Sequence, residues 1–114
     1  MSKKYKIVVS DTVAVQVKGA LSDADGKPVS FKFTLACKRL GAEEYKARME
    51  GESTTKDVMQ EVTTGWSGQR LVLEEDGTPA EFCADALDAL LDINGMANVC
   101  FVAYGKESGA HAKN

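Results

Sequence analysis

The sequence predicts an α+β fold in which an N-terminal antiparallel β-hairpin or meander packs against three to four C-terminal helices. Apolar residues alternate with polar ones as far as Leu35, which is the period of a half-buried strand, and recur at helical spacing after Arg39. The chain has 114 residues, of which 44% are hydrophobic and 27% charged, as in folded proteins with one core. We therefore expect a single α+β domain over residues 1–105 and a flexible C-terminal tail over residues 106–114.

The first predicted element is a hairpin. Apolar residues occupy alternate positions in both strands: Val13, Val15, Val17 and Leu21 in the first, and Val29, Phe31, Phe33 and Leu35 in the second. Turn-forming residues fill positions 22–28, where Gly26 is free to adopt a positive φ. Ile7 to Val9 could add a third strand. Because two strands alone are marginally stable in water, later segments must cover the apolar face.

Two helices are predicted to follow the hairpin. The spacing of apolar residues indicates a helix from about Leu40 to Gly51. Thr54 and Asp57 then have the spacing of a capping box, in which two side chains satisfy free backbone N–H groups at a helix start. They predict a second helix that Gly65 closes.

The rest of the chain is predicted to be a loop and two further elements. Residues 66–79 are expected to form a loop, with a short extended piece at residues 71–73 and a tight turn at Asp76-Gly77. A third helix is expected from about Ala84 to Asp92. The last apolar segment, residues 96–104, has the spacing of a buried helix, although its valines also suit a strand; we favour the helix.

No catalytic, cofactor or metal site is predicted. The one histidine, His111, lies in the expected tail, so no cysteine has an evident base to activate it. Cys37, Cys83 and Cys100 are expected to be buried or nearly so, and a thiol enzyme or redox sensor based on Cys83 or Cys100 is the alternative. Gly65-Trp66-Ser67-Gly68 superficially resembles a hydrolase nucleophile elbow, but Gln69 replaces the required glycine, so we interpret it as a turn.

Charge is distributed unevenly along the chain. The net charge is -3, which argues against nucleic acid as a partner, and no Lys or Arg occurs from Leu71 to Gly105. The acidic helix face in this stretch is either a solvated surface or a docking surface for a basic partner helix. Trp66 is expected to anchor a loop, with a binding hot spot as the alternative. The residues we select as candidates for partner binding are Trp66, Asp85, Leu87, Asp88, Leu91, Asp92 and Phe101.

The sequence also predicts a location. The apolar run from Ile7 to Val9 is too short for a signal peptide, and no stretch reaches the roughly 18 apolar residues of a membrane span. We therefore expect a soluble protein that stays in the cytoplasm where it is made, with no membrane partner.

Several short motifs, taken in order, resemble the tail assembly chaperones of long-tailed bacteriophages and prophages. They are Phe31-Lys32-Phe33-Thr34-Leu35, Lys38-Arg39-Leu40, Gly65-Trp66-Ser67-Gly68, Asp76-Gly77-Thr78-Pro79, Phe82-Cys83-Ala84-Asp85-Ala86-Leu87, Leu90-Leu91 and Ala103-Tyr104. The resemblance spans about Lys6 to Tyr104. The chain departs from the family pattern at Cys83, where a serine commonly caps the helix; the change weakens the cap by about 1 kcal/mol.

The resemblance implies a non-enzymatic role in virion assembly, in the cytoplasm of a bacterial host. Members of the family bind the long tape-measure protein, keep its hydrophobic helices soluble and help tail-tube subunits assemble around it. The expected partners are therefore the tape-measure protein, with the major tail-tube protein and a second copy of the chain as further candidates. The alternative function is a structural tail protein of the virion, either a tube or a tail-completion subunit.

Overall fold

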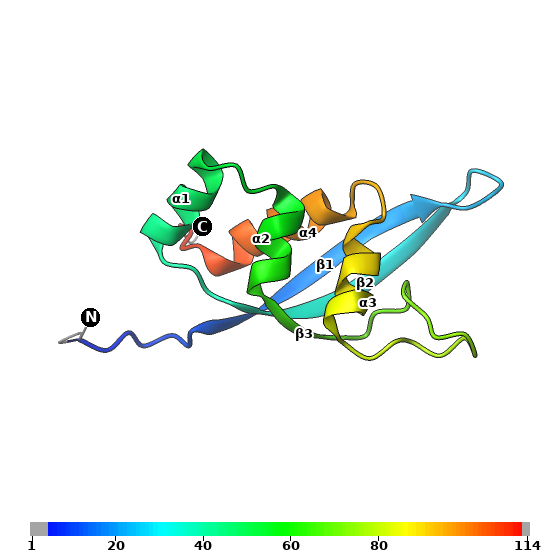
Figure 1. Ribbon diagram of the computed structural model, residues 1–114, viewed down its shortest axis with the longest axis horizontal. Helices are drawn as coiled ribbons and strands as arrows, with labels where there is room; N and C mark the ends of the chain where they lie inside the picture. Colours follow the sequence, from blue (N-terminus) through cyan, green and yellow to red (C-terminus); the bar gives the residue numbers. More distant parts are fainter. Residues whose placement is uncertain (1–4, 113–114) are drawn as a thin grey trace.

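The computed structural model describes residues 5–112 and has the predicted α+β architecture. A three-stranded antiparallel sheet with the order β1-β2-β3 forms one layer, and four helices form the other (Figure 1). In chain order the elements are β1 (Thr12–Ser22), β2 (Pro28–Lys38), α1 (Ala42–Glu50), α2 (Thr55–Val62), β3 (Thr63–Ser67), α3 (Ala84–Leu91) and α4 (Met96–Ser108).

The hairpin forms where the alternating pattern predicts it. β1 and β2 pair in one uninterrupted register, from Thr12 opposite Lys38 to Ser22 opposite Pro28. A carboxylate oxygen of Asp23 accepts hydrogen bonds from two backbone N–H groups of the turn, each at 2.9 Å. Gly26 takes the positive φ of 81° that the turn requires.

The third strand is not the one that the sequence suggested. Residues 7–9 are exposed and belong to no strand, so the prediction of a strand there is wrong. β3 instead contains Gly65-Trp66-Ser67, which was interpreted as a turn, and it follows α2 with no residue between them. Because α2 ends at Val62, Gly65 does not close it as predicted. This short segment has no alternating pattern that would favour a strand by itself. It becomes a strand because it pairs with β2.

The second helix after the hairpin, α2, begins at residues that cap it. Thr54 and Asp57 form the predicted capping box, with the Asp57 N–H donating to Thr54 Oγ1 at 3.1 Å and the Thr54 N–H donating to the Asp57 carboxylate at 3.0 Å. Arg48 of α1 donates from Nε to Glu61 of α2 at 3.0 Å, which ties the two helices together.

The last two helices lie in the predicted places, and the final apolar segment is helical rather than extended. The N-cap of α3 is Cys83, whose sulfur accepts the Ala86 N–H at 3.4 Å. α4 continues to Ser108, so the chain is still helical at residues 106–108, where the tail was expected to have begun. Residues 113–114 of that expected tail lie outside the described part of the chain.

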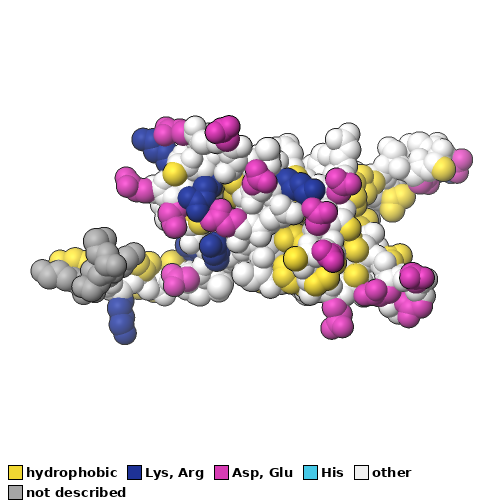
Figure 2. Space-filling view, viewed as in Figure 1, with side chains coloured by type: hydrophobic (Ala, Val, Ile, Leu, Met, Phe, Trp, Pro, Cys, Tyr) yellow, Lys and Arg dark blue, Asp and Glu magenta, His cyan; other side chains and the backbone are white. Residues whose placement is uncertain are grey.

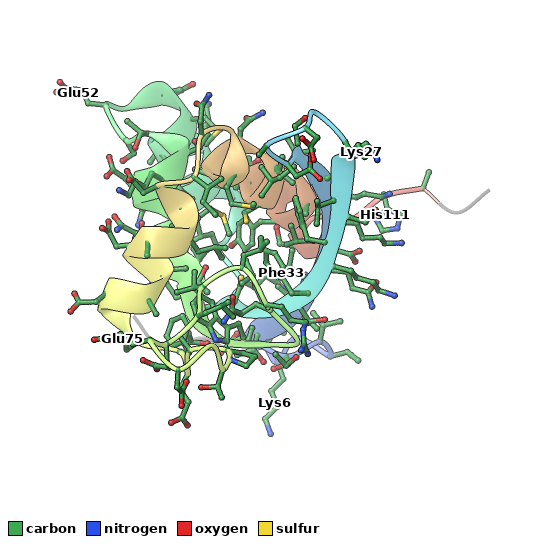
Figure 3. The ribbon with its side chains drawn as sticks, turned by 90° about the vertical axis from the view of Figure 1, so that its right-hand side faces the viewer. Lys6, Lys27, Phe33, Glu52, Glu75 and His111 are labelled. Atoms are coloured by element: carbon green, nitrogen blue, oxygen red, sulfur yellow. The ribbon has the colours of Figure 1, made fainter. Side chains whose placement is uncertain are left out.

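The core lies between the sheet and the helices, and Phe33 points into it from β2 (Figure 3). α4 packs on β1, and α2 packs on both α3 and α4. The buried side chains come from every element except α1: they include Val15, Val17, Phe33, Leu35, Val58, Met59, Val62, Leu87, Leu90, Leu91, Met96 and Tyr104. The sheet therefore has its helices on one face only, which explains the alternating pattern of its long strands.

The three cysteines differ in burial. Cys37 and Cys100 lie in the core, as expected, whereas Cys83 is exposed, so that prediction is wrong. The reason is its position at the start of α3, where the residue belongs to the cap rather than to the apolar face of the helix. Among residues 5–112 the three thiols are all free.

Two polar side chains join the end of β2 to α4. The fully buried Tyr104 donates its hydroxyl proton to Lys38 O at 2.9 Å and accepts the Leu40 N–H at 3.0 Å. Arg39 donates from Nη1 to Ser108 O at 2.6 Å and from Nε to Ser10 O at 3.3 Å. These bonds order residues 38–40 between the sheet and α1 and account for the extra helical turn of α4.

Within the described part of the chain, no single helix has both the length and the apolar character needed to cross a membrane. α3 and α4 meet that test only when taken as a pair, and a bend of 104° separates them.

Candidate partner-binding surface

Trp66 lies at the sheet edge formed by β3 and fixes the loop that follows. Its indole Nε1 donates to Ala80 O at 3.1 Å, and its ring meets Phe82 edge to face, with 5.3 Å between ring centroids. Such aromatic pairs contribute about 0.5–1.5 kcal/mol beyond the area they bury. The structure thus gives Trp66 the anchoring role that the sequence favoured.

A buried glutamine organises the same loop. The side-chain amide of Gln69 donates to Val72 O at 2.9 Å and to Ala80 O at 3.1 Å. Its oxygen accepts the N–H groups of Leu71 and Val72, at 3.1 and 2.8 Å. Four backbone groups of residues 71–80 therefore find partners in one side chain that is only 3% exposed. In the sequence Gln69 only excludes a nucleophile elbow, and no spacing of residues marks it for this role.

The loop ends in a half-buried aromatic, Phe82, which separates two shallow hollows. One, of about 250 Å³, lies toward Trp66, Gln69 and Pro79. The other, of about 310 Å³, lies between α2 and α3, and Leu87 forms part of its lining. We call this region the Phe82 surface and define it by Trp66, Pro79, Ala80, Phe82, Ala84 and Leu87.

Acidic side chains border the Phe82 surface. Glu81 and Asp85 flank Phe82 along the chain and are exposed, and Asp88 follows one turn further along α3. Figure 2 shows hydrophobic side chains over α3 with acidic ones around them, whereas basic and acidic side chains are mixed over α1 and α2. The uneven charge of the sequence is therefore also an uneven charge on the surface.

The acidic face of α3 is partly neutralised by α2. Lys56 Nζ lies 2.9 Å from Asp88 Oδ1 and 3.8 Å from Asp92 Oδ1. The hydrogen bond from Lys56 lowers the pKa of Asp88, and the same bond raises the pKa of Lys56. Asp85 makes no ion pair with another described residue.

The seven residues selected from the sequence do not form one site. Trp66, Asp85, Leu87 and Asp88 lie on or beside the Phe82 surface, and Asp92 lies one turn beyond it. Leu91 is buried in the core, as Leu87 largely is, so both mainly serve packing. Phe101 lies elsewhere: it stacks on Tyr45 of α1, with 6.1 Å between centroids.

Phe82 is the surface residue that the sequence analysis did not select. It follows a loop and precedes a cap, so no periodic pattern marks it. Its proximity to Trp66 depends on the loop closing through Ala80, which periodicity does not predict.

The chemistry available at the buried thiols is limited. Burial raises the pKa of Cys37 to about 11 and that of Cys100 to about 12, so both are protonated near neutral pH. Over residues 5–112 no three His, Cys, Asp or Glu side chains gather closely enough to hold a metal ion.

The fold and the Phe82 surface define a small α+β protein with a candidate protein-binding face. Comparisons of the chain with models of protein families, with curated proteins and with solved structures found no match.

Proposed function

We propose that this protein is a non-catalytic tail assembly chaperone of a long-tailed phage or prophage. It binds the tape-measure protein in the cytoplasm of the bacterial host and promotes assembly of the tail tube around it. The proposal rests on the family resemblance of the sequence together with one structural observation, the apolar Phe82 surface with its acidic border.

That surface suits a basic amphipathic helix. Phe82 and the hollow between α2 and α3 offer places for apolar side chains, and the hollow beside Trp66 is lined by polar groups of Ser67, Gln69 and Glu81 as well as by rings. Helix-in-groove recognition uses apolar anchors at a spacing of three or four residues. Glu81 and Asp85 carry negative charge at the border, which favours lysine or arginine on the partner. A helix bound in this way would have its apolar stripe covered while the tail tube is still unassembled.

The second candidate function is a structural tail protein, and the free edge of β1 is the feature that favours it, since subunits can polymerise through sheet edges. Mass spectrometry of purified particles separates the two functions. A chaperone is expected to be missing from the finished virion, whereas a tube subunit would be among its most abundant proteins. Recovery of the chain in stoichiometric amounts would overturn the chaperone proposal.

The partner and its surface are tested by co-expression with the tape-measure protein encoded by the same genome. We expect the tape-measure protein to stay in solution and to co-purify with the chain. Glu81→Lys combined with Asp85→Lys should abolish co-purification. Glu50→Lys combined with Glu52→Lys changes the net charge equally at the end of α1 and should leave it intact.

If both double variants still bind the tape-measure protein, the Phe82 surface is not its binding site. Loss with both variants would indicate a general effect of charge. Because the proposed contact is partly electrostatic, raising the salt concentration should slow association more than it speeds dissociation.

A further inference from the structure

From Ala14 onward the outer edge of β1 is an open strand edge with a regular pattern of free backbone groups, whereas the Thr12 N–H donates to Ser10 Oγ at 3.1 Å. The Arg39 N–H donates to Asp11 O and the Asp23 N–H donates to Lys27 O, so odd-numbered residues at both ends of β1 bond to β2. The pairing has no irregularity between them. In an antiparallel pair such residues alternate, so the even-numbered residues of β1 direct their N–H and C=O groups away from β2.

A groove runs beside this edge. It has a volume of about 470 Å³ and lies between Gln16 and Lys18 of β1 and α4, which lines it with Val99, Val102 and Ala103 and with the polar side chains of Asn98, Lys106 and Glu107. Val99 and Val102 are 36% and 61% exposed, whereas Met96, Cys100 and Tyr104 of the same helix are buried in the core. A strand edge beside an apolar helix face is the arrangement that accepts an added peptide strand.

The same chain carries an unpartnered segment that suits the groove. Tyr5, Ile7, Val8 and Val9 precede β1 and are all more than half exposed. This segment, residues 5–10, extends away from the body of the molecule along the direction of β1 (Figure 1). β-branched residues at three successive positions favour an extended strand, and exposed apolar strands of this kind usually acquire a partner.

The segment cannot fold back onto its own groove. Arg39 holds Ser10 by its side chain and Asp11 by its N–H group, so both residues stay beside the end of β2. The groove lies about six residues further along β1, and reaching it would require breaking both bonds. A second copy of the chain meets no such restriction.

We propose that two copies form a symmetric dimer in which residues 5–10 of each copy add as an antiparallel strand to the β1 edge of the other. Residues 5–10 lead into β1 along its general direction, with bends at Val8, Val9 and Asp11. Once they extend as a strand, a single two-fold axis allows both insertions at once and leaves no free edge at β1. This inference does not depend on the tail-assembly proposal.

The side chains of residues 5–10 determine the register in which this segment pairs with β1 of the other copy. When even-numbered residues of the segment lie opposite even-numbered residues of β1, the odd-numbered ones project toward the helical layer. Tyr5, Ile7 and Val9 then meet the exposed face of Val99 and Val102. A shift by one residue would turn these three side chains toward solvent.

Sedimentation equilibrium of the full chain tests the proposal. We expect a mass of twice the 12.2 kDa of the chain. Ile7→Lys with Val9→Lys, or Val102→Lys alone, should weaken the dimer about 30-fold or more, because each places a charge in the apolar contact. Val29→Lys, at an exposed valine near the hairpin turn, is the matched control and should leave the dimer unchanged.

A second measurement identifies the contact directly. In a Cys83→Ser background, a Val9→Cys chain mixed with a Val102→Cys chain should form a disulfide between the two chains under mild oxidation. A monomer at every concentration would overturn the proposal. So would a dimer that resists both lysine variants, or one that forms no such disulfide.

Discussion

The two edges of the sheet are built in different ways. The β1 edge is an 11-residue strand in unbroken register. The β3 edge has only five residues, and its register shifts where Ala36 faces Gly65 but Cys37 faces Thr63, which leaves Thr64 as an extra residue. Short strands and bulges limit further pairing at a sheet edge. The difference indicates that the β3 edge is closed, whereas the β1 edge is available for a partner strand.

The segments that pack beside the two edges of the sheet also differ. Beside β1, α4 buries Met96, Cys100 and Tyr104 against the sheet. Beside β3, the loop over residues 68–83 is held by hydrogen bonds from Gln69 and Trp66. We therefore expect substitutions on the α4 side to affect the whole fold and substitutions on the loop side to act locally.

The largest effect is expected in the core beneath α4. Met96→Ala should lower the free energy of unfolding by about 2–5 kcal/mol, because Met96 is buried and its truncation leaves a cavity. Urea unfolding followed by circular dichroism measures the change. Met49→Ala, at an exposed methionine of α1, is the control and should stay within about 0.5 kcal/mol. Equal losses for both variants would contradict the assignment of Met96 to the core.

The next effect tests the loop side. Gln69→Leu leaves the N–H groups of Leu71 and Val72 without partners and removes one of the two hydrogen bonds at Val72 O and at Ala80 O, which should cost about 1–3 kcal/mol. Faster hydrogen exchange should be confined to residues 69–82, and the emission of Trp66, the only tryptophan, should shift to longer wavelength. Gln60→Leu removes a single exposed hydrogen bond and serves as the control. Faster exchange throughout the core would show that the loop is not a local unit.

The buried thiol of Cys100, on the α4 side, should make the free energy of unfolding depend on pH. The thiol of Cys100 ionises near 9.0 when unperturbed, and burial raises its pKa to about 12 in the fold. Between these values the native state retains a proton that the unfolded state loses, so the free energy of unfolding falls as pH rises. Cys100→Ala should reduce that slope by about 1.4 kcal/mol per pH unit. Unfolding curves measured from pH 8 to pH 11 give the slopes, and identical slopes in both proteins would contradict the burial of this thiol.

The smallest expected effect is at the helix cap beside the Phe82 surface. Cys83→Ser should raise the free energy of unfolding by about 0.5–1 kcal/mol, since a hydroxyl accepts the Ala86 N–H better than sulfur does at 3.4 Å. The same variant tests exposure. A thiol reagent should label one cysteine rapidly in the native protein and none in Cys83→Ser. Rapid labelling that persists in the variant would mean that Cys37 or Cys100 is accessible.

Local patterns predicted most of the elements. The hairpin, the capping box at Thr54 and the helix beginning at Ala84 depend on residues close together in the chain, and the structure has all three. β3 was missed because five residues that include Gly65 form a strand only when β2 is present to pair with them.

The candidate site was harder to predict than the fold. The excess of acidic residues between Leu71 and Gly105 can be read directly from the sequence. In the structure some of these residues lie at the border of the Phe82 surface. The contact of Phe82 with Trp66 spans 16 positions of the chain and depends on the Gln69 network, whose members have no spacing that marks them. Phe101 was selected for its apolar character, but tertiary packing places it against α1 instead.

By itself the sequence determined the α+β class, the long hairpin, the helix starts and the uneven charge, because each follows from preferences of neighbouring residues. Only the tertiary structure decided which short segment becomes β3, how the loop closes over Trp66, which cysteine is exposed and which edge of the sheet stays open. These features depend on contacts between segments far apart in the chain. Their free energy appears only after the hairpin and the helices have assembled around a common core.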